Sequence, residues 1–158
     1  MTLRRATAAD FAFIRSLTQR PEYAEVVTAE NEVALAAYVA ASGAELLIWE
    51  TDQGKGFALF CEIGEPSGRV ELRRLALAQT GGGAGTAFMR ALIGYAFQEL
   101  GAQRLWLDAS GENLRAQALY ERMGFTFEGR QRAHWFRPTL GRAVDLMLYG
   151  LLREEWSH

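Results

Sequence analysis

The sequence predicts a mixed α/β fold, with a mostly antiparallel sheet of about seven strands flanked by about four helices. Short apolar runs of strand composition alternate with segments whose apolar residues recur every three to four positions. Three strand-like runs follow one another directly between residues 45 and 78, which favours antiparallel neighbours over a plain parallel sheet. The expected order is β-α-α-β-β-β-α-β-α-β-β, in a single domain over residues 1–158.

The first elements are a short strand over residues 3–6 and a helix that ends before Pro21. Thr7 and Asp10 form a variant of the capping box, with Asp in place of Glu, at the start of that helix. The helix has one apolar face, which consists of Phe11, Ile14 and Leu17.

The segment that follows is expected to be a loop or a short helical turn over residues 21–30, and then a helix over residues 30–41. We expect the inward face of this second helix to carry Val33, Ala37 and Ala40. Gly43 ends the helix.

The central strands are expected over residues 45–51, 57–63 and 69–78. The first two are joined by the Gly-rich residues 52–56, a hairpin signal. After a glycine run, a helix presents one apolar stripe that consists of Phe88, Leu92, Tyr95, Ala96 and Leu100.

The C-terminal part begins with a strand over residues 104–109 and a helix over residues 114–123. Asn113 stands at the N-cap position of that helix. The last two strands are expected over residues 125–132 and 143–152. The loop between them holds His134, Trp135 and Phe136.

The composition is that of an ordinary globular protein, with 49% hydrophobic and 23% charged residues. A net charge of -2 does not indicate a nucleic-acid partner, and no apolar run approaches the ~18–20 residues that span a bilayer. Cys61 is the only cysteine, so we expect neither a disulfide nor a Cys/His metal site. We therefore expect a cytoplasmic protein without metal.

The stretch from Thr80 to Thr86 is rich in glycine and lies between a strand and a helix. Such a turn holds a diphosphate well, because the first helical amides and the helix dipole favour negative charge there. A P-loop would need a Gly-Lys-Ser/Thr sequence, which does not follow here. The dinucleotide fingerprint also fails, because Phe88 stands where its last glycine belongs.

A second motif indicates which family of diphosphate-binding proteins the glycine run belongs to. It is Asn-x-x-Ala-x-x-Leu-Tyr-x-x-x-Gly-Phe, and its residues here are Asn113, Ala116, Leu119, Tyr120, Gly124 and Phe125. With the element order and the glycine run, this motif resembles the GNAT superfamily of N-acetyltransferases. The superfamily's phosphate pattern, Arg/Gln-x-x-Gly-x-Gly/Ala, matches at Gly83 and Gly85, whereas its first position is Thr80. Residues 141–156 further resemble the subgroup of ribosomal-protein N-terminal alanine acetyltransferases.

The resemblance implies acetyl-CoA as donor and a primary amine as acceptor, with direct attack in a ternary complex. The acceptor is either a protein N-terminal amine or a small-molecule amine, and a homodimer is possible for the family. The alternative is a non-catalytic CoA-binding or regulatory module that kept the fold.

The resemblance also assigns the cofactor site. The pantetheine arm would pair with the backbone of the strand at Leu75, Ala76 and Leu77, where a bulge or splay frees amides and one faces the thioester oxygen. Asn113 would bond the pantetheine amide or simply cap its helix. The pyrophosphate would lie on Thr80, Gly81, Gly82, Gly83, Ala84, Gly85 and Thr86.

Tyr120 is the expected general acid, which reprotonates the CoA thiolate and also contacts the cofactor. The resemblance implies Glu71 as the general base, because some members of the family have a glutamate in that role at the matching place. Strict alternation along the strand places it on the face of Arg73, Leu75 and Leu77, while a solvated or Arg-paired strand glutamate is the other interpretation. Glu62 and a water relay are the alternatives to Glu71.

Other residues could shape the acceptor side of this site. Asp145 could bind a cationic acceptor, although an Asp at such a place more often satisfies local backbone donors. An acidic set could attract an amine or form a solvated face, and it consists of Glu22, Glu25, Glu30 and Glu32.

Overall fold

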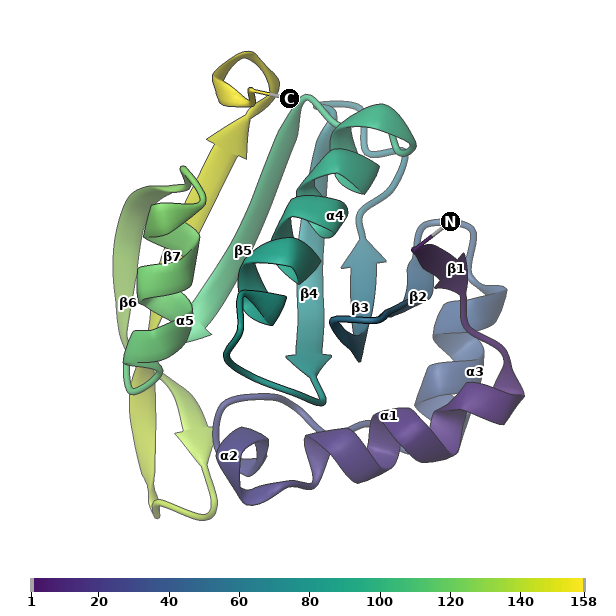
Figure 1. Ribbon diagram of the computed structural model, residues 1–158. Coiled ribbons are helices and arrows are strands. Elements are labelled where there is room, and N and C mark those ends of the chain that lie inside the picture. The colour runs from purple at the N-terminus through teal and green to yellow at the C-terminus, as the bar shows by residue number, and fades with distance from the viewer. Residues whose placement is uncertain (1, 158) are drawn as a thin grey trace.

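The computed structural model describes residues 2–157, and its centre is one seven-stranded sheet with the strand order β1-β2-β3-β4-β5-β7-β6 (Figure 1). Only β4 and β5 pair in parallel, and every other neighbouring pair is antiparallel. The strands are β1 (Leu3–Arg5), β2 (Glu45–Thr51), β3 (Gly54–Cys61), β4 (Arg69–Leu77), β5 (Arg104–Ser110), β6 (Thr126–Arg137) and β7 (Arg142–Leu152). The predicted mixed sheet is confirmed.

Five helices cover the sheet, and α4 and α5 lie over one face while α1 and α3 lie over the other (Figure 1). The helices are α1 (Phe11–Thr18), α2 (Pro21–Ala24), α3 (Glu32–Ala40), α4 (Ala84–Gln98) and α5 (Leu114–Arg122). Single turns of 3-10 helix precede α1, at Ala8–Asp10, and follow β7, at Arg153–Glu155. The sheet therefore separates two apolar cores, one on each face.

The predicted capping box is confirmed at the start of the first helical segment. The Thr7 amide donates to Asp10 Oδ2 at 2.8 Å, and Arg4 donates to both oxygens of the same carboxylate at 2.9 Å. The hydrogen bonds from Arg4 hold the pKa of Asp10 below its ordinary value. The expected apolar face of α1 is buried as well.

The expected inward face of α3 is wrong. Val33 is 79% exposed, and Ala37 and Ala40 are exposed too. Leu35 is the buried residue of this helix, and Tyr38, one turn further on, packs against the same core. The helix is apolar almost all round, so its sequence has no clear face, and packing on β2 selects the larger side chains.

A bulge interrupts β4 in the middle of the sheet. Phe60 of β3 pairs with Leu72 and Leu59 pairs with Arg74, so Arg73 is the extra residue. Beyond the bulge the side chains have changed face. Glu71 lies opposite Cys61 on the face of α1 and α3, whereas Leu75 packs against the core on the face of α4. The expectation that strict alternation puts Glu71 and Leu75 on one face is therefore wrong.

The strands β4 and β5 separate soon after they meet. Their pairing is confined to Arg69–Glu71 and Arg104–Trp106, and Figure 1 shows the two strands diverging toward their C-terminal ends. A bulge and a splay are thus both present, although the bulge lies at Arg73 and not at the expected Leu75–Leu77. Together they open the sheet beside the second half of β4.

The last hairpin is longer than expected. Trp135 and Phe136 belong to β6 and pair with Val144 and Ala143, so placing them in a loop is wrong. The register shifts between Gln131 and Trp135, which leaves residues 132–134 as a bulge opposite Asp145. Asp145 accepts a hydrogen bond from the Ala133 amide at 2.8 Å, so the bulge is stabilised and pairing resumes after it.

Gly56 provides a test of how tightly β3 and β4 pack. A Cβ there would lie 2.7 Å from the Ala76 carbonyl oxygen and 3.2 Å from atoms of Leu77 and Phe88. We expect Gly56→Ala to lower the free energy of unfolding by about 1–3 kcal/mol, as overpacking does. Chemical denaturation measures this loss.

Gly94→Ala is the matched control. This glycine lies inside α4, and its added Cβ would be 3.9 Å from the nearest atom, on Gln98. Because alanine favours a helix interior, the control is expected to gain about 0.5–1 kcal/mol. Equal effects of the two substitutions would contradict the packing described for Gly56.

Candidate active site

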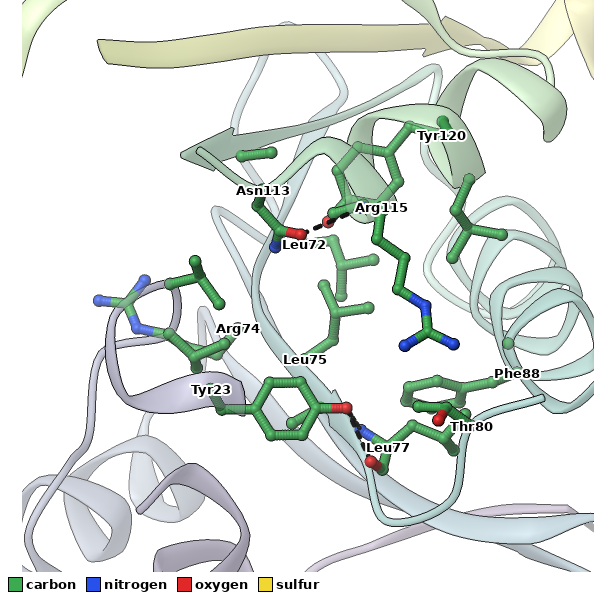
Figure 2. Close-up of a pocket in the computed structure, with 18 of the residues that line it drawn as sticks. Tyr23, Leu72, Arg74, Leu75, Leu77, Thr80, Phe88, Asn113, Arg115 and Tyr120 are labelled. Atoms are coloured by element: carbon green, nitrogen blue, oxygen red, sulfur yellow. Dashed lines mark hydrogen bonds between the residues drawn. The ribbon is translucent and has the colours of Figure 1, made fainter. Parts of the chain in front are cut away.

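A cleft of about 560 Å³ opens where β4 and β5 diverge. Its floor is the second half of β4, and one side is formed by α5 with the loop that leads into α4. The opposite side comes from α2 and the residues after it (Figure 2). Trp135 of β6 lines the cleft too, and Arg137, which stacks on it, donates to Ala24 of α2. The cleft therefore brings together segments from most of the chain.

The glycine run forms one end of the cleft. Gly81, Gly82 and Gly83 have φ of 87°, 61° and 83°, a left-handed conformation that side chains disfavour. No side chain caps the N-terminus of α4 that follows. Among the predicted pyrophosphate residues, Thr80, Gly81, Gly83, Gly85 and Thr86 line the cleft. Of the other two, Gly82 is exposed and Ala84 is buried in the core.

Two backbone amides of β4 point into the open gap, and two others point toward β3. The Ala78 amide donates to the Lys55 carbonyl of the neighbouring loop at 2.8 Å, so the Ala76 amide also points toward β3, because hydrogen bonds alternate along an antiparallel pair. The amides of Leu75 and Leu77 point the other way, toward β5.

Tyr23 of α2 binds the backbone of Leu77, the second of the two residues whose amides point into the gap. Its hydroxyl donates to the Leu77 carbonyl at 2.7 Å and accepts from the Leu77 amide at 2.9 Å (Figure 2). The sequence contains no signal for this contact, because 54 residues separate the partners. The amide of Leu75 therefore remains as the β4 donor available to a ligand in the gap.

Tyr120 extends from α5 into the depth of the cleft, and its residue is only 4% exposed. Its ring contacts Phe125 and Tyr149, with centroids 6.0 and 5.7 Å apart. Burial, with a smaller contribution from the charge of Asp108, raises the pKa of Tyr120 above its ordinary value. The phenol therefore stays protonated at neutral pH.

Asp108 of β5 is the cleft residue that the sequence reasoning missed. Asp108 lines the cleft, and its side chain has no hydrogen bond or ion pair to another residue within 2–157. Burial raises the pKa of its carboxyl, and the negative charge of Glu71 adds to the effect. Its signal was a lone carboxylate in the otherwise apolar part of β5, five residues before Asn113.

The two glutamates considered as general base are already paired. Glu71 is 8% exposed and binds Arg73, with 2.7 Å between Oε1 and Nη2. Glu62 accepts from Arg69 Nε at 2.7 Å and from Trp106 Nε1 at 2.8 Å. Neither glutamate is among the residues that line the cleft. Glu71 stays a prediction, and the geometry favours Asp108 beside it.

Asn113 both lines the cleft and caps α5, because its Oδ1 accepts from the Ala116 amide at 3.2 Å (Figure 2). The expected capping role is confirmed, and contact with a cofactor stays a prediction. The second motif thus has a structural task that places Tyr120 two turns further along the same helix.

Two arginines of α5 lie beside the glycine loop. The guanidinium of Arg115 extends toward Thr80 and Phe88 (Figure 2) and has no hydrogen bond or ion pair to another described residue. Arg122 Nη2 lies 3.5 Å from the Thr86 hydroxyl. The cleft therefore has positive charge near its loop although the loop itself contains none.

The other side of the cleft is tied to the last hairpin. Arg137 donates to the Ala24 carbonyl at 2.8 Å, and its guanidinium stacks on Trp135, 3.9 Å from the ring centroid. These contacts join α2 to β6. Asp145 bonds Ala133 and Arg130, so its local role as a backbone partner is confirmed.

Across residues 2–157 the structure contains no cluster of three metal-binding side chains. Nor is any helix in that part of the chain long and apolar enough to cross a membrane.

A family profile described as an acetyltransferase (GNAT) domain matches residues 1–126. The chain therefore belongs to the GNAT acetyltransferase family, as the two motifs predicted.

Two curated relatives share part of the chain. The protein named "Putative ribosomal N-acetyltransferase YdaF", from Bacillus subtilis (strain 168), is 41% identical over 72 residues, which cover 46% of this chain and 38% of that protein. The protein named "Uncharacterized N-acetyltransferase p20", from Bacillus licheniformis, is 27% identical over 113 residues, 71% of this chain and 62% of that protein. The chain thus spans less than two thirds of either relative.

The solved structures extend the likeness to nearly the whole chain. A spermidine N-acetyltransferase, a chimera of SpeG from Vibrio cholerae and hSSAT, superposes with a TM-score of 0.79 at 26% identity. The superposition covers 98% of this chain and 97% of that one.

The Tyr23 contact predicts a local effect on β4. We expect Tyr23→Phe to lower the free energy of unfolding by about 1–3 kcal/mol, because the Leu77 amide and carbonyl lose their partner. Hydrogen exchange at the Leu77 amide should become faster. The Ala78 amide, which bonds Lys55 instead, is the internal control, and equal acceleration at both amides would contradict the assignment.

Proposed function

We propose that this protein transfers the acetyl group of acetyl-CoA to a primary amine by direct attack in a ternary complex. One observation carries the proposal. The cleft combines a free β4 amide, an uncapped helix N-terminus behind a glycine loop, a protonated phenol and an unpaired carboxylate. Family membership supports the same reaction class.

The residues of the cleft fit the cofactor's two chemically different parts. The first-turn amides of α4, behind the glycines, suit the pyrophosphate. Arg115 lies near Thr80, where the family pattern has Arg or Gln, so we assign the missing side-chain contact to Arg115. The β4 backbone at Leu75 suits the amide-rich pantetheine arm, and Asn113 borders it.

Acetyl-CoA supplies an acetyl thioester to this cleft. The Asp108 carboxylate takes a proton from the incoming ammonium, which leaves an amine with a free electron pair. The Leu75 amide donates a hydrogen bond where negative charge develops on the carbonyl oxygen. As the C–N bond forms and the C–S bond breaks, Tyr120 donates its phenolic proton to the leaving sulfur, and the second proton of the attacking nitrogen returns to the phenolate.

The relatives suggest two acceptors. The name of YdaF refers to ribosomal acetylation, which favours a protein N-terminal amine, and SpeG is a spermidine acetyltransferase, which favours a small amine. A non-catalytic CoA-binding module is the alternative to both. Release of the CoA thiol across a panel of amines and peptides separates these cases. Cofactor binding without any thiol release would support the module.

The catalytic roles predict distinct kinetic effects. We expect Tyr120→Phe to lower kcat by roughly 10²–10⁴-fold, the usual contribution of a general acid, with CoA affinity unchanged in calorimetry. Asp108→Asn should lower kcat by a similar factor. It should also remove the rise of activity with pH, because the wild-type carboxyl must be ionised to accept a proton.

Stability provides the control for Asp108. Its raised pKa means that the folded state disfavours the ionised form, so Asp108→Asn should be at least as stable as wild type at pH 7. This advantage should shrink as the pH falls through the raised pKa, where wild type is protonated too. Glu71→Gln is the rival variant. If the rise of activity with pH is lost in Glu71→Gln and kept in Asp108→Asn, Glu71 is the base.

If Arg115 makes the phosphate contact, an arginine at position 80 should be able to replace it. We expect Arg115→Ala to weaken CoA binding by roughly tenfold or more, the value of a charged hydrogen bond, and Thr80→Arg in the same chain to restore much of it. Isothermal titration measures both. Affinity for pantetheine, which lacks phosphate, should not change.

Arg90→Ala is the matched control, because Arg90 is exposed on α4 and does not line the cleft. If Arg115→Ala and Arg90→Ala weaken CoA binding equally, the effect is one of net charge, and Arg115 makes no contact.

A further inference from the structure

The charges of the cleft carry information about the acceptor. Four arginines line the cleft, Arg73, Arg74, Arg115 and Arg122, and Asp108 is its only carboxylate among residues 2–157. A cleft with this balance differs from one built to attract several positive charges at once. The question is which of these charges an acceptor meets.

The arginines divide into two pairs by position. Arg115 and Arg122 lie on α5 near the glycine loop, on the side assigned to the phosphates. Arg73 and Arg74 lie on β4 near α2 and α3. Arg73 is neutralised by Glu71 at 2.7 Å.

Arg74 is neutralised in turn by Glu30, whose Oε1 lies 3.7 Å from Nη2. Arg74 also donates to the Arg73 carbonyl at 2.9 Å, which holds its side chain against β4. In Figure 2 the guanidinium points away from Tyr120, toward the segment after α2. Glu30 is thus engaged by an arginine and presents no free carboxylate to a ligand.

The rest of the acidic set does not reach the acceptor either. Glu32 is paired with Arg15 at 3.7 Å, and Glu22 and Glu25 are exposed on or beside α2, outside the residues that line the cleft. Asp108 is therefore the only carboxylate that lines the cleft among residues 2–157, and its side chain forms no ion pair there. The charges of Arg74 and Arg73 offset only part of the effect by which burial raises its pKa.

The walls on this side are largely apolar. Val26 and Val27 follow α2, Trp135 lies on β6, and Leu146 lies on β7. A second ammonium group would lose water against these side chains without gaining a carboxylate. An apolar or aromatic body would instead bury its surface there.

We propose that the acceptor is an amine with a single positive charge on an apolar or aromatic body, and that polyamines are poor acceptors. The ammonium binds Asp108, and the body packs on Trp135 and the two valines. A second ammonium finds no further carboxylate among the described residues that line the cleft. This inference rests on the proposed acetyl transfer, because it names the acceptor of the same cleft.

The experiment compares a monoamine and a diamine with the same six-carbon chain, and adds spermidine as a longer triamine. Hexylamine, 1,6-diaminohexane and spermidine are titrated into the complex of wild-type protein with CoA, and thiol release from acetyl-CoA is measured with each. We expect hexylamine to bind roughly tenfold more tightly than the diamine, and to have the higher kcat/KM by a similar factor, because the second ammonium loses water against apolar walls and gains no carboxylate. Spermidine should be weaker still.

A variant makes the charge argument specific. Arg74→Gln frees the Glu30 carboxylate and should bring the diamine within about threefold of hexylamine, a change that a lost contact alone would not produce. Arg90→Gln, outside the cleft, should leave the tenfold preference unchanged.

The outcomes separate the two proposals. Equal or tighter binding of the diamine or spermidine to wild type would overturn the single-charge acceptor, while acetyl transfer could stand. The expected binding preference without thiol release from any amine would overturn catalysis and leave the charge selectivity standing. No amine bound at millimolar concentration would overturn the acceptor inference.

Discussion

The bulge at Arg73 is the local feature on which the rest of the structure depends. One extra residue in β4 changes the face of every side chain that follows, so Leu75 packs under α4 and Glu71 lies on the opposite side of the sheet. Beyond the bulge β4 no longer follows β5, and the sheet opens. A regular strand would have paired throughout and left neither a free amide nor a cleft.

The cleft then collects groups that are unfavourable for stability. Asp108 lies half-buried without a hydrogen bond or ion pair to the described residues, and the Tyr120 phenol is buried below it. Burying a carboxylate without a partner costs folding free energy. Groups kept at such a cost in a cleft are typical of sites that bind or transform a ligand. The hydrogen bonds of Tyr23 and Arg137, which join α2 to β4 and β6, offset part of this free-energy cost.

The GNAT family defines the reaction class, whereas its members differ in the acceptor they use. The two sides of this cleft carry different charges. Arg115 and Arg122 give positive charge near the loop, and ion pairs neutralise Arg73 and Arg74 on the other side.

The sequence by itself determined the family, the element order and the local signals, because these depend on neighbouring residues. The box at Thr7 and Asp10 and the cap at Asn113 are contacts within one turn. Tertiary structure alone decided the inward face of α3, where almost every residue is apolar, and the end of β6, which continues because Asp145 supports a bulge. It also decided the site. The cleft brings three residues to β4, namely Asp108, Tyr23 and Arg115. They lie near β4 only because strands distant in the chain pair and then diverge, and a local sequence pattern cannot predict that arrangement.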